Sequence, residues 1–341
     1  MKKIKVGIIG YGIVGSKRRI YIDKNKYFKL VAVSDIKFKN KYLKKKGVLY
    51  FKFFNDLIKL KNLDAVFVTL PNYLASVVTI ECLKKKLHVF CEKPPAKNVN
   101  ELKKVIKIYK KNSKLKLKYG FNHRYHSSIK LAKQIISKRK YGEILNIRCL
   151  YGKSKIVTYG KSEWRSKKKF AGGGILIDQG IHVLDLLRFF NGDFKEFKSF
   201  VSNKFWKYDI EDNAFALLRD SKGVIASIHS TATQWQHRFR MEITLKRALL
   251  ELNGILSGSK SYGRESLMLI TRSMKSGKGS ARSKKYYFKL DNSWKNEIDE
   301  FGNIIRKNLP VKTGNIHDAL KVMQMVEKIY FSDKKWKRKK L

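Results

Sequence analysis

The chain begins with an apolar segment that runs into a glycine-rich turn: residues 4–15 read IKVGIIGYGIVG. The apolar residues Ile4 to Ile9 predict a buried strand. The pattern G-x-G-x-x-G follows at Gly10, Gly12 and Gly15 and opens a helix. The first glycine permits a tight turn, the second lets the backbone approach a pyrophosphate, and the third lets helix and strand pack closely. This order of strand, turn and helix predicts a nicotinamide-dinucleotide site.

We expect the residues between the glycines, Ile13 and Val14, to contact the cofactor too, because the phosphates sit on the helix N-terminus. A second strand, Leu30 to Ser34, ends directly before Asp35, which lies about 20 residues beyond the last glycine. A carboxylate there accepts from the ribose hydroxyls and repels a 2′-phosphate. Asp35 therefore favours NAD over NADP, although Lys37 and Lys39 close behind it soften that preference and keep NADP open.

Short apolar runs continue to alternate with amphipathic stretches through the first third of the chain. Strands are predicted near Val48 to Phe51, Ala65 to Leu70, His88 to Cys91 and Leu115 to Phe121, and a Lys-rich helix is expected after Ser34. Strands that are apolar on both faces and alternate with helices indicate a doubly wound parallel sheet. Residues 1–122 are therefore interpreted as a Rossmann domain in an α/β protein.

Beyond residue 122 the strands come in hairpin order, which predicts a second, α+β domain over residues 123–331 with a mostly antiparallel sheet. Its expected strands are Ile144 to Tyr151, Ala214 to Leu218, Val224 to Thr231, Phe239 to Leu245, Ala248 to Asn253, Leu267 to Thr271 and Tyr286 to Leu290. The Gly/Ser/Lys-rich stretch Ser273 to Lys285 is expected to be a mobile loop, and residues 332–341 a basic tail.

The charge is strongly one-sided, with 77 Lys and Arg against 27 Asp and Glu and a net charge of +50. Such a field attracts polyanions. The basic residues are nevertheless spread over the whole chain, and no zinc finger, basic zipper or aromatic RNA-binding motif accompanies them. We interpret the excess as compositional bias and expect no specific nucleic-acid partner.

Three cysteines at unrelated spacings, Cys82, Cys91 and Cys149, indicate neither a disulfide framework nor a zinc site. No signal peptide is expected, because Gly7, Gly10 and Gly12 break the first apolar run. No uncharged apolar stretch is long enough to span a bilayer. A cytoplasmic protein without a membrane span or a bound metal is expected.

Two further groups of residues carry chemistry. Glu92, Lys93 and Pro94 lie at the carboxyl end of the fifth predicted strand, the edge that faces the ligand in an open parallel sheet. A Lys there is placed to approach the nicotinamide and the reacting oxygen; the competing interpretation is one more solvent-facing Lys.

In the second domain, Asp178 and His182 are four residues apart on a predicted helix, and Asp185 continues the same face. A His in this position can take a proton from a hydroxyl as hydride leaves, with its pKa and orientation set by the neighbouring carboxylate. A buried structural pair and a metal pair are the alternatives; no third ligand at suitable spacing supports the metal.

Taken together, these motifs resemble the glucose–fructose oxidoreductase and inositol dehydrogenase family (Gfo/Idh/MocA), in order and over nearly the whole chain. The matching residues are the glycine turn with Asp35, Pro71-Asn72, Glu92-Lys93-Pro94, Gly120 to Arg124, Trp164-Arg165, and Gly173-Gly174 with Asp178, Gly180, His182 and Asp185. One position departs from the pattern: Ala75 stands where many relatives carry a His.

The resemblance implies a role for each matching residue. Lys93, His182 and Asp178 are the implied catalytic residues: Lys93 touches the reacting hydroxyl and the cofactor, His182 is the general base, and Asp178 holds the substrate. Pro71, Asn72 and Glu92 join the implied cofactor contacts, and Arg124, Trp164 and Arg165 the substrate contacts. For Trp164 and Arg165, the competing interpretation is a packed Trp beside a surface Arg.

The family also implies an open sheet in the second domain that makes contacts in a homo-oligomer, a dimer or a tetramer. The leading functional expectation is an NAD(P)-dependent oxidoreductase that transfers a hydride between the nicotinamide and a ring hydroxyl or ketone of a sugar or nucleotide-activated sugar. An inositol or free-sugar dehydrogenase is the alternative within enzymes. A catalytically silent dinucleotide-binding regulator is the alternative of another class.

Overall fold

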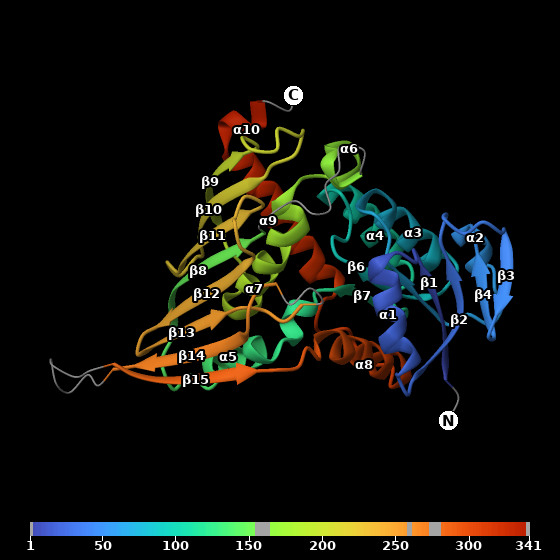
Figure 1. The fold of residues 1–341 in the computed structure, drawn as a ribbon, viewed down its shortest axis with the longest axis horizontal. Coiled ribbons are helices and arrows are strands. Elements are labelled where there is room, and N and C mark those ends of the chain that lie inside the picture. The colour runs from blue at the N-terminus through green and yellow to red at the C-terminus, as the bar shows by residue number, and fades with distance from the viewer. Residues whose placement is uncertain (1–2, 154–163, 258–260, 273–280, 339–341) are drawn as a thin grey trace. The chain divides into compact units, whose positions relative to one another are not determined.

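The computed structural model describes residues 3–153, 164–257, 261–272 and 281–338 (Figure 1). The chain forms two compact units. The first comprises Met1–Phe121, Lys169–Gly172 and Trp294–Leu320, and the second comprises Asn122–Lys168, Gly173–Ser293 and Lys321–Leu341. The sequence did not indicate that segments 169–172 and 294–320 return to the first unit.

The first unit is built on a seven-stranded sheet in the order β3-β4-β2-β1-β5-β6-β7 (Figure 1). All neighbouring strands run parallel except the β3–β4 pair. The strands are β1 (Ile4–Ile9), β2 (Phe28–Ser34), β3 (Tyr42–Lys45), β4 (Val48–Phe51), β5 (Ala65–Val68), β6 (His88–Glu92) and β7 (Leu117–Gly120). This sheet confirms the predicted Rossmann fold.

Helices accompany this sheet in the first unit. They are α1 (Ile13–Asp23), α2 (Phe54–Leu57), α3 (Asn72–Lys84), α4 (Val99–Lys110), α6 (Lys168–Ala171) and α8 (Ser293–Arg306), with α6 and α8 in the returning segments. Phe301 of α8 packs against Phe28, Phe67 and Phe90 with ring centroids 6.2, 5.7 and 5.5 Å away. Phe301 is fully buried, so α8 is part of this core. Burial of such a side chain contributes about 1.5–3 kcal/mol.

The prediction of a helix after Ser34 is wrong, because a hairpin of β3 and β4 follows β2. Lys45 pairs with Val48, so the loop between the strands consists of two residues. Lys46 and Gly47 both have positive φ, 49° and 74°. Those angles are the ones a type I′ turn requires, and Lys-Gly supplies a glycine for one of them.

The second unit contains an eight-stranded sheet in the order β15-β14-β13-β12-β8-β11-β10-β9 (Figure 1). Only the β8–β11 pair runs parallel among the described strands, which confirms a mostly antiparallel sheet. The strands are β8 (Ile144–Gly152), β9 (Glu196–Ser202), β10 (Asn213–Arg219), β11 (Ile225–Thr231), β12 (Arg238–Leu245), β13 (Ala248–Asn253), β14 (Glu265–Thr271) and β15 (Arg282–Phe288).

Two details of this sheet differ from expectation. The sequence did not predict β9, and β15 begins at Arg282, within the expected loop Ser273 to Lys285. Residues 273–280 of that loop lie outside the described residues.

The helices of the second unit are α5 (Ser127–Ser137), α7 (Ile181–Asn191), most of α9 (Ile316–Ser332) and α10 (Lys334–Arg338). A π-helical turn, Leu176–Gly180, leads into α7. The expected basic tail is partly folded, because α10 lies within it and Trp336 is buried.

One helical segment among the described residues, Lys168–Asn191, is long and apolar enough to cross a membrane by length and composition. In its most apolar window, 78% of the segment is buried inside the protein. Burial of that extent is the behaviour of a core helix, so the segment is only weak evidence for a membrane span.

Candidate functional site

The glycine turn of the first unit has the geometry that its sequence predicts. Gly10 has a φ of 89°, and a Cβ added there would lie 2.6 Å from the Thr69 carbonyl oxygen. A Cβ on Gly15 would lie 2.1 Å from the Gly10 carbonyl oxygen, so helix and turn pack too closely for a side chain. A Cβ on Gly12 would meet no described atom within 4 Å. The turn is thus crowded on its protein side and open at Gly12, where a phosphate group has to approach.

The N-terminus of α1 is equally suited to an anion. Gly12 is its N-cap, with no side-chain hydrogen bond to the first turn and no acidic residue in that turn. Ile13 is 87% exposed and Val14 is half-buried. The backbone N–H groups of this turn therefore remain available to phosphate oxygens, and the helix dipole favours negative charge.

Asp35 stands directly beyond β2, next to the glycine turn. Its Oδ2 accepts from Tyr11 N at 2.7 Å and its Oδ1 from Lys37 N at 2.9 Å. These two backbone donors orient the carboxylate at the edge of the turn and leave further lone pairs on both oxygens. An oriented, partly exposed carboxylate fits a ribose diol and opposes a 2′-phosphate. The residues present therefore fit NAD.

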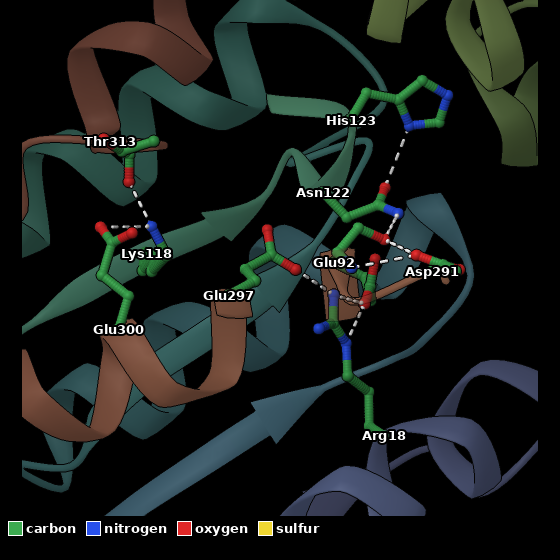
Figure 2. Close-up of polar contacts among 10 residues, drawn as sticks. Arg18, Glu92, Lys118, Asn122, His123, Asp291, Glu297, Glu300 and Thr313 are labelled. Carbon is green, nitrogen blue, oxygen red and sulfur yellow. Dashed lines mark hydrogen bonds and ion pairs between the residues drawn. The ribbon is translucent and has the colours of Figure 1, made fainter. Parts of the chain in front are cut away.

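At the end of β6, the predicted motif divides into two different environments. Lys93 is half-buried, and the Lys93–Pro94 peptide bond is cis. Glu92, expected to touch the cofactor, is buried and pairs with Arg18 of α1 at 2.6 Å (Figure 2). Arg18 is fully buried and also contacts Glu297 of α8 at 2.7 Å. Neither Arg18 nor Glu297 was among the residues that the sequence singled out.

Pro71 and Asn72 begin α3, and Asn72 holds a returning segment. The Asn72 side-chain amide donates to the Ala171 carbonyl oxygen at 2.7 Å and is buried. Ala75, one turn further along, is also buried. The Asn72 side chain therefore has a structural partner within the first unit, beside the cofactor role that the resemblance implies.

In the second unit, Asp178 lies in the π-helical turn and His182 in the first turn of α7. Asp178 Oδ2 forms an ion pair with Lys153 Nζ at 3.2 Å, and both side chains are mostly buried. Lys153 directly follows β8 and was not predicted, since nothing in the sequence separates it from the many other lysines. The Asp178–Lys153 pair presents a fixed carboxylate and a fixed ammonium close to the expected base.

His182 is stacked on a second imidazole, that of His123. The ring centroids are 3.7 Å apart and the ring planes differ by 14°. His123 Nε2 lies 3.1 Å from Tyr151 Oη and its Nδ1 lies 3.2 Å from Asn122 Oδ1. Burial raises the pKa of Tyr151. His123 lies within a motif of the sequence that gave it no predicted role.

The hydrogen bonds around His123 favour one tautomer. Asn122 Nδ2 donates to Ser293 Oγ at 3.3 Å, and Ser293 Oγ donates to Asp291 Oδ1 at 2.6 Å (Figure 2). With the amide so oriented, Asn122 Oδ1 faces His123 and accepts from Nδ1–H. The Tyr151 hydroxyl, which lies at His123 Nε2, also hydrogen-bonds to Tyr262. The His123 ring is thus held at both nitrogens, and His182 stacks on this oriented ring.

Three residues expected at the substrate have protein partners in the structure. Arg124 and Asp185 form a buried bidentate pair, with Nε–Oδ2 at 2.7 Å and Nη2–Oδ1 at 2.6 Å. The Arg165 guanidinium lies over the Trp164 ring, 4.4 Å from its centroid. Arg124 thus joins α7 to the start of the second unit, and Trp164 and Arg165 pack on each other.

A buried carboxylate organises the turn that precedes Asp178. Glu211 accepts from Gly174 N at 2.7 Å, from Leu176 N at 2.8 Å and from Tyr330 Oη at 2.8 Å. Burial raises the pKa of Glu211, and these hydrogen bonds act in the opposite direction. Glu211 therefore holds the start of the segment that carries Asp178 and His182.

Both units match models of one family of enzymes. Residues 4–121 match the oxidoreductase family with an NAD-binding Rossmann fold, and residues 129–251 match the C-terminal domain of the same family. The chain belongs to the GFO/IDH/MocA family. This membership confirms the resemblance read from the motifs.

Several GFO/IDH/MocA proteins are similar to the chain. It is 31% identical over 194 residues to glucose-6-phosphate 3-dehydrogenase of Bacillus subtilis, a match that covers 56% of the chain and 55% of the relative. Myo-inositol 2-dehydrogenase of Thermotoga maritima is 25% identical over 325 residues, covering 91% and 89%. The first curated relatives are matched over about half of their length.

Solved structures show the same fold. Levoglucosan dehydrogenase in complex with NADH has a TM-score of 0.83 at 18% identity, with 98% of each chain covered. Aldose-aldose oxidoreductase from Caulobacter crescentus has a TM-score of 0.82 at 20% identity, again with 98% of each chain covered. Among the described residues of this GFO/IDH/MocA member, no group of three or more His, Cys, Asp or Glu could hold a metal ion.

Proposed function

We propose that the chain is an NAD(P)-dependent dehydrogenase acting on a ring hydroxyl or ketone of a sugar or nucleotide-activated sugar. The observation that carries this proposal is the cluster of the second unit, in which His182 stacks on the oriented His123 ring, one helical turn from Asp178 and its ion pair with Lys153. The glycine turn alone would suit a silent dinucleotide-binding regulator equally well. A regulator has no need of an acid–base group.

NAD, when bound at the glycine turn, supplies the carbon that accepts the hydride. The chain's own residues act on the substrate oxygen. His182 takes the hydroxyl proton while the hydride leaves the carbon that bears that hydroxyl, so a ketone is left. Lys93 favours the developing alkoxide through its positive charge. Asp178, itself held by Lys153, orients the substrate by accepting from a hydroxyl.

The relatives support the substrate class. Their names describe dehydrogenases of glucose 6-phosphate, levoglucosan and inositol, all polyhydroxylated rings. An inositol or free-sugar dehydrogenase remains the alternative, and the long match to a myo-inositol dehydrogenase favours it.

The test is the absorbance of reduced nicotinamide while the purified protein meets NAD or NADP with sugars, sugar phosphates, inositols and nucleotide sugars. Turnover with one group of substrates, lost in Lys93→Ala, is expected. Lys84→Ala, an exposed Lys in an ion pair with Glu81, is the control and should keep full turnover. Tight cofactor binding without turnover across the panel would contradict the proposal in favour of a regulator.

We also propose a homo-oligomer that forms through the outer face of the second unit's sheet. Phe200, Phe215 and His229 lie side by side on neighbouring strands, and Phe200 is 80% and Phe215 49% exposed. The His229 ring stacks on Phe215 at 3.7 Å, and burial lowers its pKa to about 4, so the row is uncharged at neutral pH. Exposed apolar rows of this kind favour association. Light scattering should give a multiple of 39.8 kDa for the wild type and a smaller mass for Phe200→Glu.

We propose a cytoplasmic location as well. Cys82, Cys91 and Cys149 are free and buried, and burial raises the pKa of the Cys91 thiol to about 12. Unpaired thiols are typical of reducing compartments. Fractionation of cells that express the protein tests this proposal, and recovery from an exported fraction would contradict it.

A further inference from the structure

A buried group of charges lies behind Lys93 in the first unit. Arg18 comes from α1, the helix that the glycine turn opens, and its side chain is fully buried. The guanidinium contacts Glu92 at the end of β6 at 2.6 Å and Glu297 of α8 at 2.7 Å (Figure 2). It lies between two aromatic rings, 4.4 Å from the Phe90 centroid and 4.2 Å from that of Trp294. A planar cation with this many contacts is held in one position.

The surrounding backbone is shaped to admit Glu92. A Cβ on Gly120 would lie 2.8 Å from Glu92 Oε2 and 3.2 Å from Arg18 Nη2. Gly120 on β7 therefore leaves the room that the ion pair occupies. Because Glu92 is covalently joined to Lys93, the pair with Arg18 also restrains the backbone from which the Lys93 side chain starts.

The charges in this group do not balance. One guanidinium faces two carboxylates, and Lys118 of β7 is turned toward Glu300 at 3.4 Å and the Thr313 carbonyl oxygen. Arg18 Nη1 and Glu297 Oε1 are buried and find no hydrogen-bond partner among the described residues. A buried site with excess negative charge and an unpartnered carboxyl oxygen favours a proton on one carboxyl group.

Glu297 is the group that takes this proton. Burial raises its pKa to about 7; Arg18 and Lys118 lower it, and Glu92 raises it. Near neutral pH the cluster thus exists in two forms. With Glu297 protonated, the guanidinium charge is balanced by Glu92. With Glu297 ionised, a second negative charge shares the guanidinium and repels Glu92.

We propose that Arg18 is a positioning residue for Lys93, acting through Glu92, and that the proton on Glu297 controls how firmly it does so. The proposal rests on the proposed function for the role of Lys93. It goes beyond that function by assigning a pH-dependent support to the catalytic Lys from residues that touch neither cofactor nor substrate.

The first test is the pH dependence of turnover. In the wild type, kcat should fall as the pH rises through about 7, because ionised Glu297 weakens the hold on Glu92. Glu297→Gln imitates the protonated form and should move this alkaline limb upward by more than about one pH unit, since its neutral amide cannot ionise. Asp299→Asn removes the charge of a partly exposed carboxylate of the same helix, which pairs with Lys295, and keeps an oxygen for Asn25 Nδ2; it should leave the limb in place. An unshifted limb in Glu297→Gln would overturn the proposal.

Arg18→Lys tests the positioning step. The variant keeps the charge but loses the planar fork. We expect kcat to fall about tenfold or more while the Kd of NADH changes less than about threefold, the split that a loss of Lys93 positioning produces. If cofactor affinity and kcat fall equally, Arg18 supports the cofactor-binding helix α1 and not Lys93, which would contradict the proposal.

Two readouts need no substrate, so they separate this proposal from the proposed function. The native pKa of Glu297 lies above the usual value of 4.5, so the native state binds this proton more tightly than the unfolded state. As the pH rises from about 4.5 to 7, the free energy of unfolding should therefore decrease more steeply in the wild type than in Glu297→Gln. The rate at which acetic anhydride labels Lys93, divided by its rate at Lys84, should differ between Arg18→Lys and the wild type. Identical pH slopes, or an unchanged labelling ratio, would overturn the inference even if no sugar is turned over.

Discussion

Asp35 is the residue that sets the choice of cofactor in this account. Its carboxylate is oriented by Tyr11 N and Lys37 N at the place where the adenosine ribose is expected. Asp35→Asn keeps a hydrogen-bond acceptor at this position and removes the negative charge. Loss of the repulsion between this charge and a 2′-phosphate, about 1.4 kcal/mol, should raise the preference for NADP relative to NAD about tenfold. The ratio of the two dissociation constants measures this effect.

Asp23→Asn provides the control, because Asp23 lies in the last turn of α1 and pairs with Arg19 at the surface. It should leave the ratio of dissociation constants unchanged. If Asp35→Asn leaves the ratio where the wild type has it, Asp35 does not read the ribose.

In the proposed function, His182 carries the proton transfer. His182→Ala should lower kcat by about 10²–10⁴, the usual contribution of a positioned acid or base. The Kd of NADH should stay within about twofold, because His182 belongs to the second unit and the glycine turn to the first. Stopped-flow turnover and NADH fluorescence measure the two quantities. The exposed His317→Ala is the control, and undiminished turnover in His182→Ala would remove the proposed base.

At the scale of the element, the start of α7 depends on Glu211. Its carboxylate accepts from two backbone N–H groups, and a Gln side chain has only one oxygen to offer them. Glu211→Gln should lower the free energy of unfolding by about 1–3 kcal/mol, the cost of an unsatisfied buried group. It should also lower kcat, since Asp178 and His182 follow the same turn.

Urea unfolding and turnover check this prediction together. Glu196→Gln, which removes an exposed carboxylate on β9 paired with Arg219, should alter neither. Loss of stability with unaltered kcat would mean that the start of α7 tolerates the change without moving His182.

The elements also show what the sequence can and cannot predict. Continuous apolar runs correctly predicted β1, β2, β5 and β6, because a strand that is buried on both faces carries apolar residues at nearly every position. The segment after Asp35 was assigned to a helix because its many lysines obscure the two-residue turn at Lys46 and Gly47. In the same way Lys153 was hidden among other lysines, and its ion pair with Asp178 exists only in the folded chain.

At the scale of the whole molecule, the missed features are those that distant segments create. Arg18 meets Glu92 and Glu297, which are 74 and 279 residues away in sequence. Asn72 meets Ala171 across 99 residues. Periodicity and motif spacing describe neighbours along the chain, whereas the contacts of Glu297 and Ala171 depend on the return of α8 and α6 to the first unit. The motifs therefore name candidate site residues, whereas the side chains that support them are evident only in the fold.

The central claim, hydride transfer from a sugar ring to a nicotinamide, is tested most directly by following the hydrogen itself. The full chain would be incubated with NAD and ring-deuterated sugars, sugar phosphates or inositols, and the recovered NADH analysed by mass spectrometry. The account predicts NADH one mass unit heavier with one class of substrate, and none with His182→Ala in the same time. Bound NAD that remains unreduced with every deuterated ring would contradict it.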